Sequence, residues 1–176
     1  MKTFRQYIEF IDDKSKLLEL KVLDKLNELG LEYFIYEHPP LRTVEESKAL
    51  RGEMHGGHTK NLFLRDKKKK NYLITVNENQ KIDLKFLEYE LSTGRLSFGS
   101  PERLSQFLGV KPGAVSPLAL LNDKHNDVAF FIDHNLLSEN ILNFHPLVNH
   151  LTVSIKVTDF KYFLKSQNKF YNEIYF

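Results

Sequence analysis

Apolar residues return at helical spacing near the start of the chain. Between Lys14 and Leu29, leucine and valine recur every three or four positions, which places them on one face of a helix. Gly30 follows, and glycine is typical of the residue that ends a helix in a left-handed conformation. Further helices are predicted to begin near capping residues at Thr43, Asp83, Ser100 and Thr158 or Asp159.

Strand patterns separate these helices. Residues 58–66 and 71–77 are rich in apolar and β-branched residues, and the lysine-rich stretch 67–70 between them predicts an antiparallel hairpin with a charged turn. Residues 111–117 contain two prolines and a glycine, which interrupt both periodicities and predict a loop. The remaining strand patterns cover residues 31–38, 95–100, 128–133 and 150–157.

Strands and helices interleave along the chain, but several connections are too short for a crossover between parallel strands. The sequence therefore predicts an α/β protein with a mixed, mostly antiparallel sheet surrounded by helices. No internal repeat, low-complexity tract or flexible linker divides the chain. A length of 176 residues fits one domain, so we expect residues 1–176 to fold as one unit, with a leading helix region (1–30) and a core (31–176).

Composition narrows the possible functions. Hydrophobic residues make up 41% of the chain and charged residues 27%, which is typical of a soluble globular protein, and we expect neither a signal peptide nor a membrane span. Cysteine is absent, which excludes disulfides and thiolate chemistry. The net charge is only +2, so contact with nucleic acid must come from local clusters. Residues 66–72 are the obvious candidate, with a solvated hairpin turn as the ordinary alternative.

Histidines raise the question of a metal site. His55 and His58 are three positions apart, a spacing that metal sites use, but the glycine pair between them argues against a rigid helical face. The other histidines are scattered, and zinc needs three or four converging ligands. We therefore expect no metal. The sequence contains no Walker loop, dinucleotide-binding glycine motif or nucleophile elbow, so we expect no cofactor either.

The remaining candidate chemistry is positive and polar. Lys60 and Asn61 follow the glycine pair at the mouth of a strand, where a lysine is either solvated or a fixed charge aimed at a ligand. Arg95 and Ser97 would share one face of a short strand, because side chains alternate along it. The small residues of the segment 113–117 would let a loop backbone approach a ligand closely. Together these features favour a pocket for a small anionic group.

Four segments together resemble the YbaK/ProX-type aminoacyl-tRNA deacylases: "HPPLRTVEES", "LRGEMHGGHTKNLFLRDKK", "LSTGRLSFGSPERLSQFLGVKPGAVSPLALLND" and "FHPLVNHLTVSI". The likeness is strongest to the freestanding alanyl-tRNA(Pro) editing branch, also known as prolyl-tRNA synthetase-associated domains, and it runs from about Gly30 to Phe176. It implies an α/β fold with a mixed, partly barrel-like sheet. It also implies hydrolysis of the ester of a mischarged tRNA.

The resemblance assigns roles to residues that match the family motifs. Lys60, Asn61 and His145 would be catalytic, with Lys60 anchoring the terminal phosphate or the ester carbonyl and His145 orienting the amino acid. The glycine pair before Lys60 would let the acceptor end of the tRNA come close. The aminoacyl pocket would be lined by Gly113, Ala114, Val115, Ser116, Pro117 and Leu118. The tRNA would be held by Arg65, Arg95 and Ser97.

An aminoacyl ester is activated, so the enzyme needs mainly to hold the terminal adenosine, position a water and stabilise an oxyanion. The ribose hydroxyl beside the ester would help to activate the water, and no side-chain nucleophile is required. We expect a cytoplasmic monomer that binds the acceptor end of tRNA(Pro), with prolyl-tRNA synthetase as a second partner. Two alternatives stay open: a cysteinyl- or seryl-tRNA deacylase of the same family, and a non-catalytic module that binds tRNA or a nucleotide.

Overall fold

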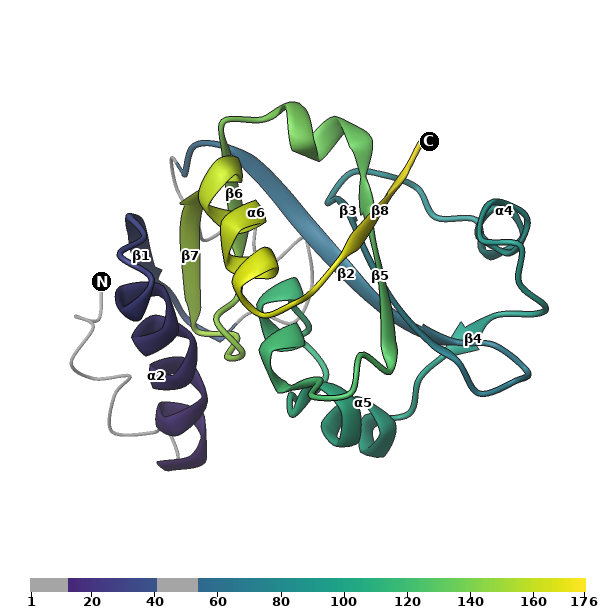
Figure 1. The fold of residues 1–176 in the computed structure, drawn as a ribbon, viewed down its shortest axis with the longest axis horizontal. Helices are drawn as coiled ribbons and strands as arrows, with labels where there is room; N and C mark the ends of the chain where they lie inside the picture. Colours follow the sequence, from purple (N-terminus) through teal and green to yellow (C-terminus); the bar gives the residue numbers. More distant parts are fainter. Residues whose placement is uncertain (1–12, 41–53) are drawn as a thin grey trace.

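The computed structural model describes residues 13–40 and 54–176 (Figure 1). Its helical elements are α2 (Asp13–Glu28), α4 (Leu84–Glu90), α5 (Pro101–Leu108), α6 (Val157–Ser166) and the 3-10 helices η1 (Pro117–Asn122) and η2 (His134–Ser138). Its strands are β1 (Tyr33–Glu37), β2 (Gly57–Arg65), β3 (Asn71–Asn77), β4 (Ser97–Phe98), β5 (Val128–Asp133), β6 (Ile141–Phe144), β7 (Leu151–Lys156) and β8 (Tyr171–Ile174).

The described strands form one mixed sheet in the order β1-β7-β6-β2-β3-β5-β8, and β4 pairs with β2 beside this path. The antiparallel pairs are β1–β7, β6–β7, β2–β3 and β2–β4, and the parallel pairs are β2–β6, β3–β5 and β5–β8. The predicted α/β class with a mixed sheet is confirmed. The sheet is open, because β1 and β8 end the order without pairing with each other.

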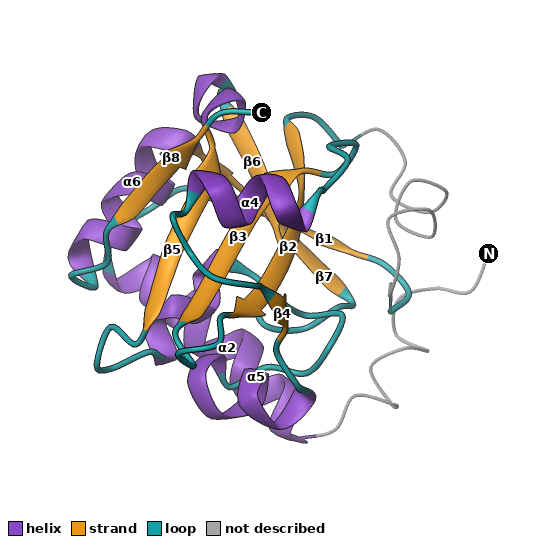
Figure 2. Cartoon of the chain, turned by 90° about the vertical axis from the view of Figure 1, so that its right-hand side faces the viewer, coloured by secondary structure: helices purple, strands orange, loops and turns teal. Residues whose placement is uncertain are grey.

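Two hydrophobic clusters cover opposite faces of the sheet. The larger one, here called the main core, joins the sheet to α2, α5, η1 and α6 through side chains such as Leu26, Leu108, Leu118 and Phe160. The smaller cluster lies under α4, which crosses the near face of β2 and β3 in Figure 2. Strand β2 contributes to both, because Phe63 packs in the main core while Leu64 packs under α4. This alternation shows which way every side chain of β2 points.

Local sequence signals explain where the helices begin and end. The side chain of Ser100 accepts a hydrogen bond from the backbone N–H of Arg103 at 3.2 Å, and Pro101 occupies the first turn of α5. Gly109 ends α5 with a φ of 67°, a left-handed conformation that glycine adopts at low cost. Asp83 caps α4 in the same way by accepting from the N–H of Lys85.

Most predicted elements are confirmed, with differences at short segments. Helix α6 begins at Val157, one residue before the predicted start. Strand β4 has only two residues, so Arg95 precedes the strand that was predicted to contain it. The helix predicted to begin at Thr43 falls outside the described residues. The short strands β6 and β8 and the 3-10 helix η1 were not predicted.

Candidate active site

The parallel pairing of β2 with β6 places two of the predicted catalytic residues on the same face of the sheet. His58 on β2 is paired with Asn143 on β6. Two positions further along come Lys60 on β2 and His145 directly after β6. Residues at the same level of paired strands point to the same face, so both side chains leave the sheet on one side. Lys60 lies inside strand β2 as its fourth residue, where the chain is better fixed than at the predicted strand mouth.

The face that carries Lys60 and His145 is polar and buried. It lies opposite the main core, because Leu142 and Phe144 of β6 pack in that core and the residues between and after them point away. Asn143 faces Ser154 across β6 and β7, and the same alternation continues along β7 and β1. We call this surface the polar face, and its buried members are His38, Asn143, His150, Thr152 and Ser154.

Hydrogen bonds hold the polar face rigid. The side-chain amide of Asn143 donates to the backbone carbonyl of His55 at 2.9 Å, and its carbonyl oxygen accepts from the hydroxyl of Ser154. Nε2 of His38 lies 2.9 Å from the hydroxyl of Thr152, and Nδ1 of His38 lies 2.9 Å from the carbonyl oxygen of Pro39. Buried polar groups are tolerated only when they are paired in this way. The network therefore fixes the strands beneath Lys60 and His145.

His145 is held in one protonation state. Its Nδ1 lies 2.8 Å from the carbonyl oxygen of Leu151, so Nδ1 carries the proton and donates it. Burial lowers the pKa of His145 below its usual value, the bond to Leu151 raises it, and the nearby His38 and His150 lower it further. The ring centroid of His38 lies 5.9 Å away. A neutral His145 with its proton on Nδ1 presents Nε2 as an acceptor.

The glycine pair before Lys60 has a structural role. A Cβ on Gly56 would lie 2.7 Å from the carbonyl oxygen of Ile141, and the φ of Gly56 is 97°. A Cβ on Gly57 would lie 2.9 Å from Cδ2 of Leu142. Both glycines therefore let β2 approach β6 closely. The expectation that they also let the acceptor end come close stays a prediction, because the contacts of the two glycines explain only their packing against β6.

Asn61 and the segment 113–118 make their described contacts on the main-core side of the sheet. Asn61 alternates with Lys60, so it points to the main-core side of β2, where its carbonyl oxygen accepts from the hydroxyl of Thr75 at 2.6 Å. Ala114 and Leu118 are buried in the main core, and Ser116 is buried and caps η1 by accepting from the N–H of Leu118. The rest of the predicted pocket lining is Gly113, with a φ of 88°, Val115, packed against the main core, and the buried Pro117.

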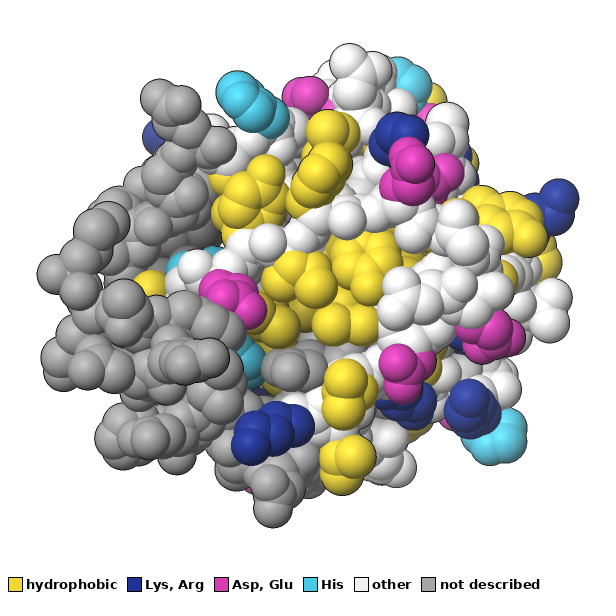
Figure 3. All heavy atoms as spheres, turned by 90° about the vertical axis from the view of Figure 1, so that its left-hand side faces the viewer, with side chains coloured by type: hydrophobic (Ala, Val, Ile, Leu, Met, Phe, Trp, Pro, Cys, Tyr) yellow, Lys and Arg dark blue, Asp and Glu magenta, His cyan; other side chains and the backbone are white. Residues whose placement is uncertain are grey.

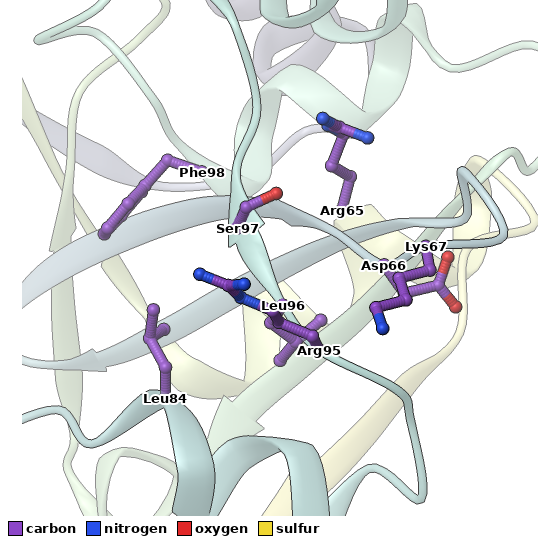
Figure 4. A pocket seen from close by; sticks show the side chains of 8 residues that line it. All are labelled: Arg65, Asp66, Lys67, Leu84, Arg95, Leu96, Ser97 and Phe98. Carbon is purple, nitrogen blue, oxygen red and sulfur yellow. The ribbon is translucent and has the colours of Figure 1, made fainter.

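The residues predicted to hold the tRNA lie together. Arg65, Arg95 and Ser97 line a hollow of about 450 Å³. We call it the basic hollow, and its lining is Arg65, Asp66, Lys67, Leu84, Arg95, Leu96, Ser97 and Phe98 (Figure 4). In this view the guanidinium of Arg95 extends to the side of β4 on which Phe98 and Leu84 lie, while Arg65 extends on the other side. Neither Lys60 nor the segment 113–118 lines the basic hollow.

A larger and apolar hollow opens beside β1. Its volume is about 720 Å³, and apolar side chains gather around it on the face seen in Figure 3. Phe34 on the edge strand β1 is 67% exposed at this hollow, and Ser154 of the polar face reaches its lining. Its single lysine, Lys156, pairs with Glu32 at 2.8 Å. This hollow is therefore less suited to phosphate than the basic one.

The sequence contained a signal for the polar face that we did not use. In the strand pattern 150–157, polar side chains occupy every second position at His150, Thr152 and Ser154, which indicates a strand with one polar face.

Within residues 13–40 and 54–176, no group of three or more acidic or histidine side chains is arranged to hold a metal ion. In the same part of the chain, no helix is both long and apolar enough to cross a membrane.

Comparison with known proteins places this geometry in a family. The family model of the aminoacyl-tRNA editing domain matches residues 38–163. The "Prolyl-tRNA editing protein ProX" of Acetoanaerobium sticklandii is 37% identical over 154 residues, covering 87% of this chain and 94% of that protein. The mouse "Prolyl-tRNA synthetase associated domain-containing protein 1" is 35% identical, covering 85% of this chain and 90% of its own length.

The fold agrees with a solved structure. A protein described as a proposed trans-editing enzyme for prolyl tRNA synthetase superposes with a TM-score of 0.66 at 19% identity, covering 93% of this chain and 97% of that one. At this identity the likeness concerns the fold alone, whereas the family model spans both strands of the predicted catalytic pair. The chain therefore belongs to the aminoacyl-tRNA editing domain family.

Proposed function

We propose that this protein hydrolyses alanyl-tRNA(Pro) in trans and so removes alanine from mischarged tRNA. Membership of the editing family makes the chain an aminoacyl-tRNA deacylase, a hydrolase that acts on mischarged tRNA. The amino acid that it removes is the proposed part. Such an enzyme would act in the cytoplasm as a monomer, with the acceptor end of tRNA(Pro) as its substrate and prolyl-tRNA synthetase as its docking partner.

The observation that carries the proposal is the placement of Lys60 and His145 at one level of adjacent strands, on the polar face. The strand fixes the backbone of Lys60 and the direction in which its side chain leaves the sheet. The ammonium charge stabilises the negative oxygen that forms when water attacks the ester carbonyl, or it binds the terminal phosphate. Hydrolysis by water at such a charge requires no side-chain nucleophile.

The reaction follows from these groups and from the substrate itself. Water attacks the ester carbonyl carbon, and the ribose hydroxyl beside the ester helps to remove the proton of that water. The bond between the carbonyl carbon and the ribose oxygen then breaks, and the ribose oxygen takes up a proton. His145 is neutral, so its Nε2 accepts a hydrogen bond from the α-ammonium group of the amino acid and orients the ester.

Discrimination against proline requires a steric sieve, because affinity for a smaller side chain supplies only about 1–3 kcal/mol. The segment Gly113–Leu118 stays our proposal for that sieve, and Asn61 stays a proposed catalytic residue. Ala114 is 6% exposed and Leu118 is fully buried, so enlarging either would overpack the main core. Val115 is partly buried at the edge of that core and is the better position to test. Val115→Phe is expected to lower the rate on alanyl-tRNA more than the affinity for tRNA.

The test is a panel of esters. The unmodified protein is incubated with alanyl-, prolyl-, cysteinyl- and seryl-tRNA, and the first-order deacylation rates are compared with the uncatalysed rates. We expect the largest acceleration for alanyl-tRNA(Pro) and at least about 10-fold less for prolyl-tRNA. Preference for the cysteinyl or seryl ester would assign the alternative substrates. Tight binding of tRNA without acceleration of any ester would assign a binding module.

A further inference from the structure

Phe98 is an exposed aromatic residue in a hollow that is also lined by cations. Its side chain is 61% exposed, although its partner on β2, Leu64, is fully buried. One exposed aromatic residue needs no explanation by itself. Here it lines the basic hollow together with Arg65 and Arg95. An exposed aromatic ring with cations nearby is the combination that binds unpaired nucleotides, because bases stack on the ring while cations neutralise the phosphates.

The two arginines carry unneutralised charge. Neither has an ion pair with a described residue, and the one carboxylate in the lining of the hollow belongs to Asp66. The carboxylate of Asp66 accepts from the backbone N–H of Lys70 at 2.9 Å and from the hydroxyl of Tyr72 at 3.1 Å. Burial, with the bond to Asp66, raises the pKa of Tyr72 to about 12, so that hydroxyl remains a donor.

The second nearby acid is also occupied. The carboxylate of Glu88 accepts from the backbone N–H of Leu96 at 2.7 Å. Both acids therefore serve as acceptors for local backbone or side-chain donors. The lining holds three cations, Arg65, Lys67 and Arg95, against the single carboxylate of Asp66, so the basic hollow keeps a net positive charge for a ligand.

The backbone beside Phe98 is held by close packing of Gly99 against Phe63 of β2. A Cβ on the next residue, Gly99, would lie 2.5 Å from Cδ1 of Phe63, so the chain after β4 passes directly over that buried ring. The backbone N–H of Gly99 donates to the carbonyl oxygen of Phe63 at 2.9 Å. This close packing onto β2 holds the exposed ring of Phe98 in place.

One edge of β2 connects Phe98 with the candidate active site. Strand β3 pairs along the other edge, so β6 and β4 must share this one, at the pairs His58–Asn143 and Leu64–Phe98. Between them, no strand among the described residues pairs with this edge. The distance along β2 from Lys60 to Leu64 is about 13 Å at ~3.3 Å per residue.

That distance is similar in length to the 3′ end of a tRNA. Four unpaired nucleotides follow the last base pair, so the first and the fourth are three steps apart, about 10 Å at a stacked rise of ~3.4 Å per step and more where the strand is extended. We infer that Phe98 stacks on the base of the first unpaired nucleotide, while Arg65 and Arg95 neutralise the flanking phosphates. The inference rests on the proposed function, because it places the terminal adenosine and its ester at Lys60.

The test separates stacking from hydrolysis. Phe98→Leu removes the aromatic ring but keeps an apolar side chain, and Phe98→Tyr is the matched control that keeps the ring. First, each protein is titrated with deacylated tRNA that carries 2-aminopurine at the first unpaired position, whose fluorescence falls when the base stacks. Second, kcat/KM is measured on alanyl-tRNA and on 3′-O-alanyl-adenosine, which lacks the nucleotides that Phe98 would meet.

Quenching by the unmodified protein and by Phe98→Tyr, with little quenching by Phe98→Leu, is the expected result. The ratio of kcat/KM on alanyl-tRNA to that on alanyl-adenosine should fall about 10-fold in Phe98→Leu and stay near its original value in Phe98→Tyr. Equal quenching by all three proteins would overturn the inference and leave the deacylase intact. Failure of the unmodified protein to hydrolyse either ester would refute the proposed function. The fluorescence titration would still test the stacking of Phe98, because it measures binding of deacylated tRNA and needs no hydrolysis.

Discussion

The polar face and the basic hollow both include residues of β2, and they differ in the exposure and the hydrogen bonding of their polar groups. On the polar face, Asn143 and Ser154 are 4% and 3% exposed and are hydrogen-bonded to each other. In the basic hollow, Phe98 is 61% exposed and Arg65 and Arg95 have no described ion-pair partner. The polar groups of the first region are buried and hydrogen-bonded to each other. The arginines of the second region are open to solvent and available to pair with a ligand.

This difference separates two tasks of one enzyme. Charges in a sheltered, hydrogen-bonded site act strongly on a developing oxyanion, because little water screens them. Exposed arginines are screened over about 10 Å at 0.1 M salt, so they contribute to binding only near contact with phosphate. We therefore expect changes in the polar face to affect stability and rate, and changes in the basic hollow to affect tRNA affinity and its salt dependence.

The largest expected effect on folding comes from Asn143. Asn143→Leu leaves the carbonyl of His55 and the hydroxyl of Ser154 without their partner, and each lost buried partner costs about 1–3 kcal/mol. We expect the free energy of unfolding to fall by about 2–4 kcal/mol, measured by urea denaturation. Arg95→Gln is the control from the basic hollow and should change it by less than about 0.5 kcal/mol. Equal losses in the two variants would remove the distinction between the regions.

A smaller effect is expected from the arginines on tRNA affinity. Arg65→Gln and Arg95→Gln should each weaken tRNA binding about 3- to 10-fold at low salt, because each removes one phosphate contact. The slope of log affinity against log salt should fall by about one unit for each substitution. Lys165→Gln, on the exposed last turn of α6, is the matched control. An unchanged slope in both arginine variants would show that neither contacts phosphate.

The smallest effect concerns pH. Burial lowers the pKa of His145 from the usual 6.5, so the neutral form persists to lower pH in the folded protein. An ordinary histidine would lose about fourfold of its neutral form between pH 7.5 and pH 6. We expect kcat/KM to fall less than this over the same range. The contribution of neutral His145 to the free energy of unfolding is complete above pH 6.5. It is lost as pH falls through the lowered pKa, because the unfolded state then binds more protons. A full fourfold fall in kcat/KM would contradict the neutral role of His145.

Much of the fold could be predicted from local signals. Gly30, Ser100 and Gly109 mark helix ends through their own backbone preferences, and the alternation in 58–66 and 71–77 specifies the β2–β3 hairpin. Strands β6 and β8 could not be predicted, because each has four residues and is defined by partners distant in sequence. Short strands follow tertiary context more than intrinsic propensity.

The candidate site was predicted only in part. The family resemblance pointed to Lys60 and His145, but their common level depends on the parallel register of β2 and β6, which the sequence does not encode locally. The glycine pair at 56–57 was assigned to ligand access, and its packing against β6 was not predicted. The exposure of Phe98 could not be predicted either, because an aromatic residue in a strand pattern usually indicates burial.

The central claim is that the ammonium group of Lys60 on the polar face drives hydrolysis. The most direct measurement is single-turnover deacylation of alanyl-tRNA(Pro) by Lys60→Met, which keeps an unbranched apolar stem but loses the charge, beside the exposed control Lys165→Met. We predict a loss of about 100- to 1,000-fold for Lys60→Met, with tRNA affinity changed far less, and an unchanged rate for the control. A Lys60→Met rate within about threefold of the unmodified protein would contradict the account.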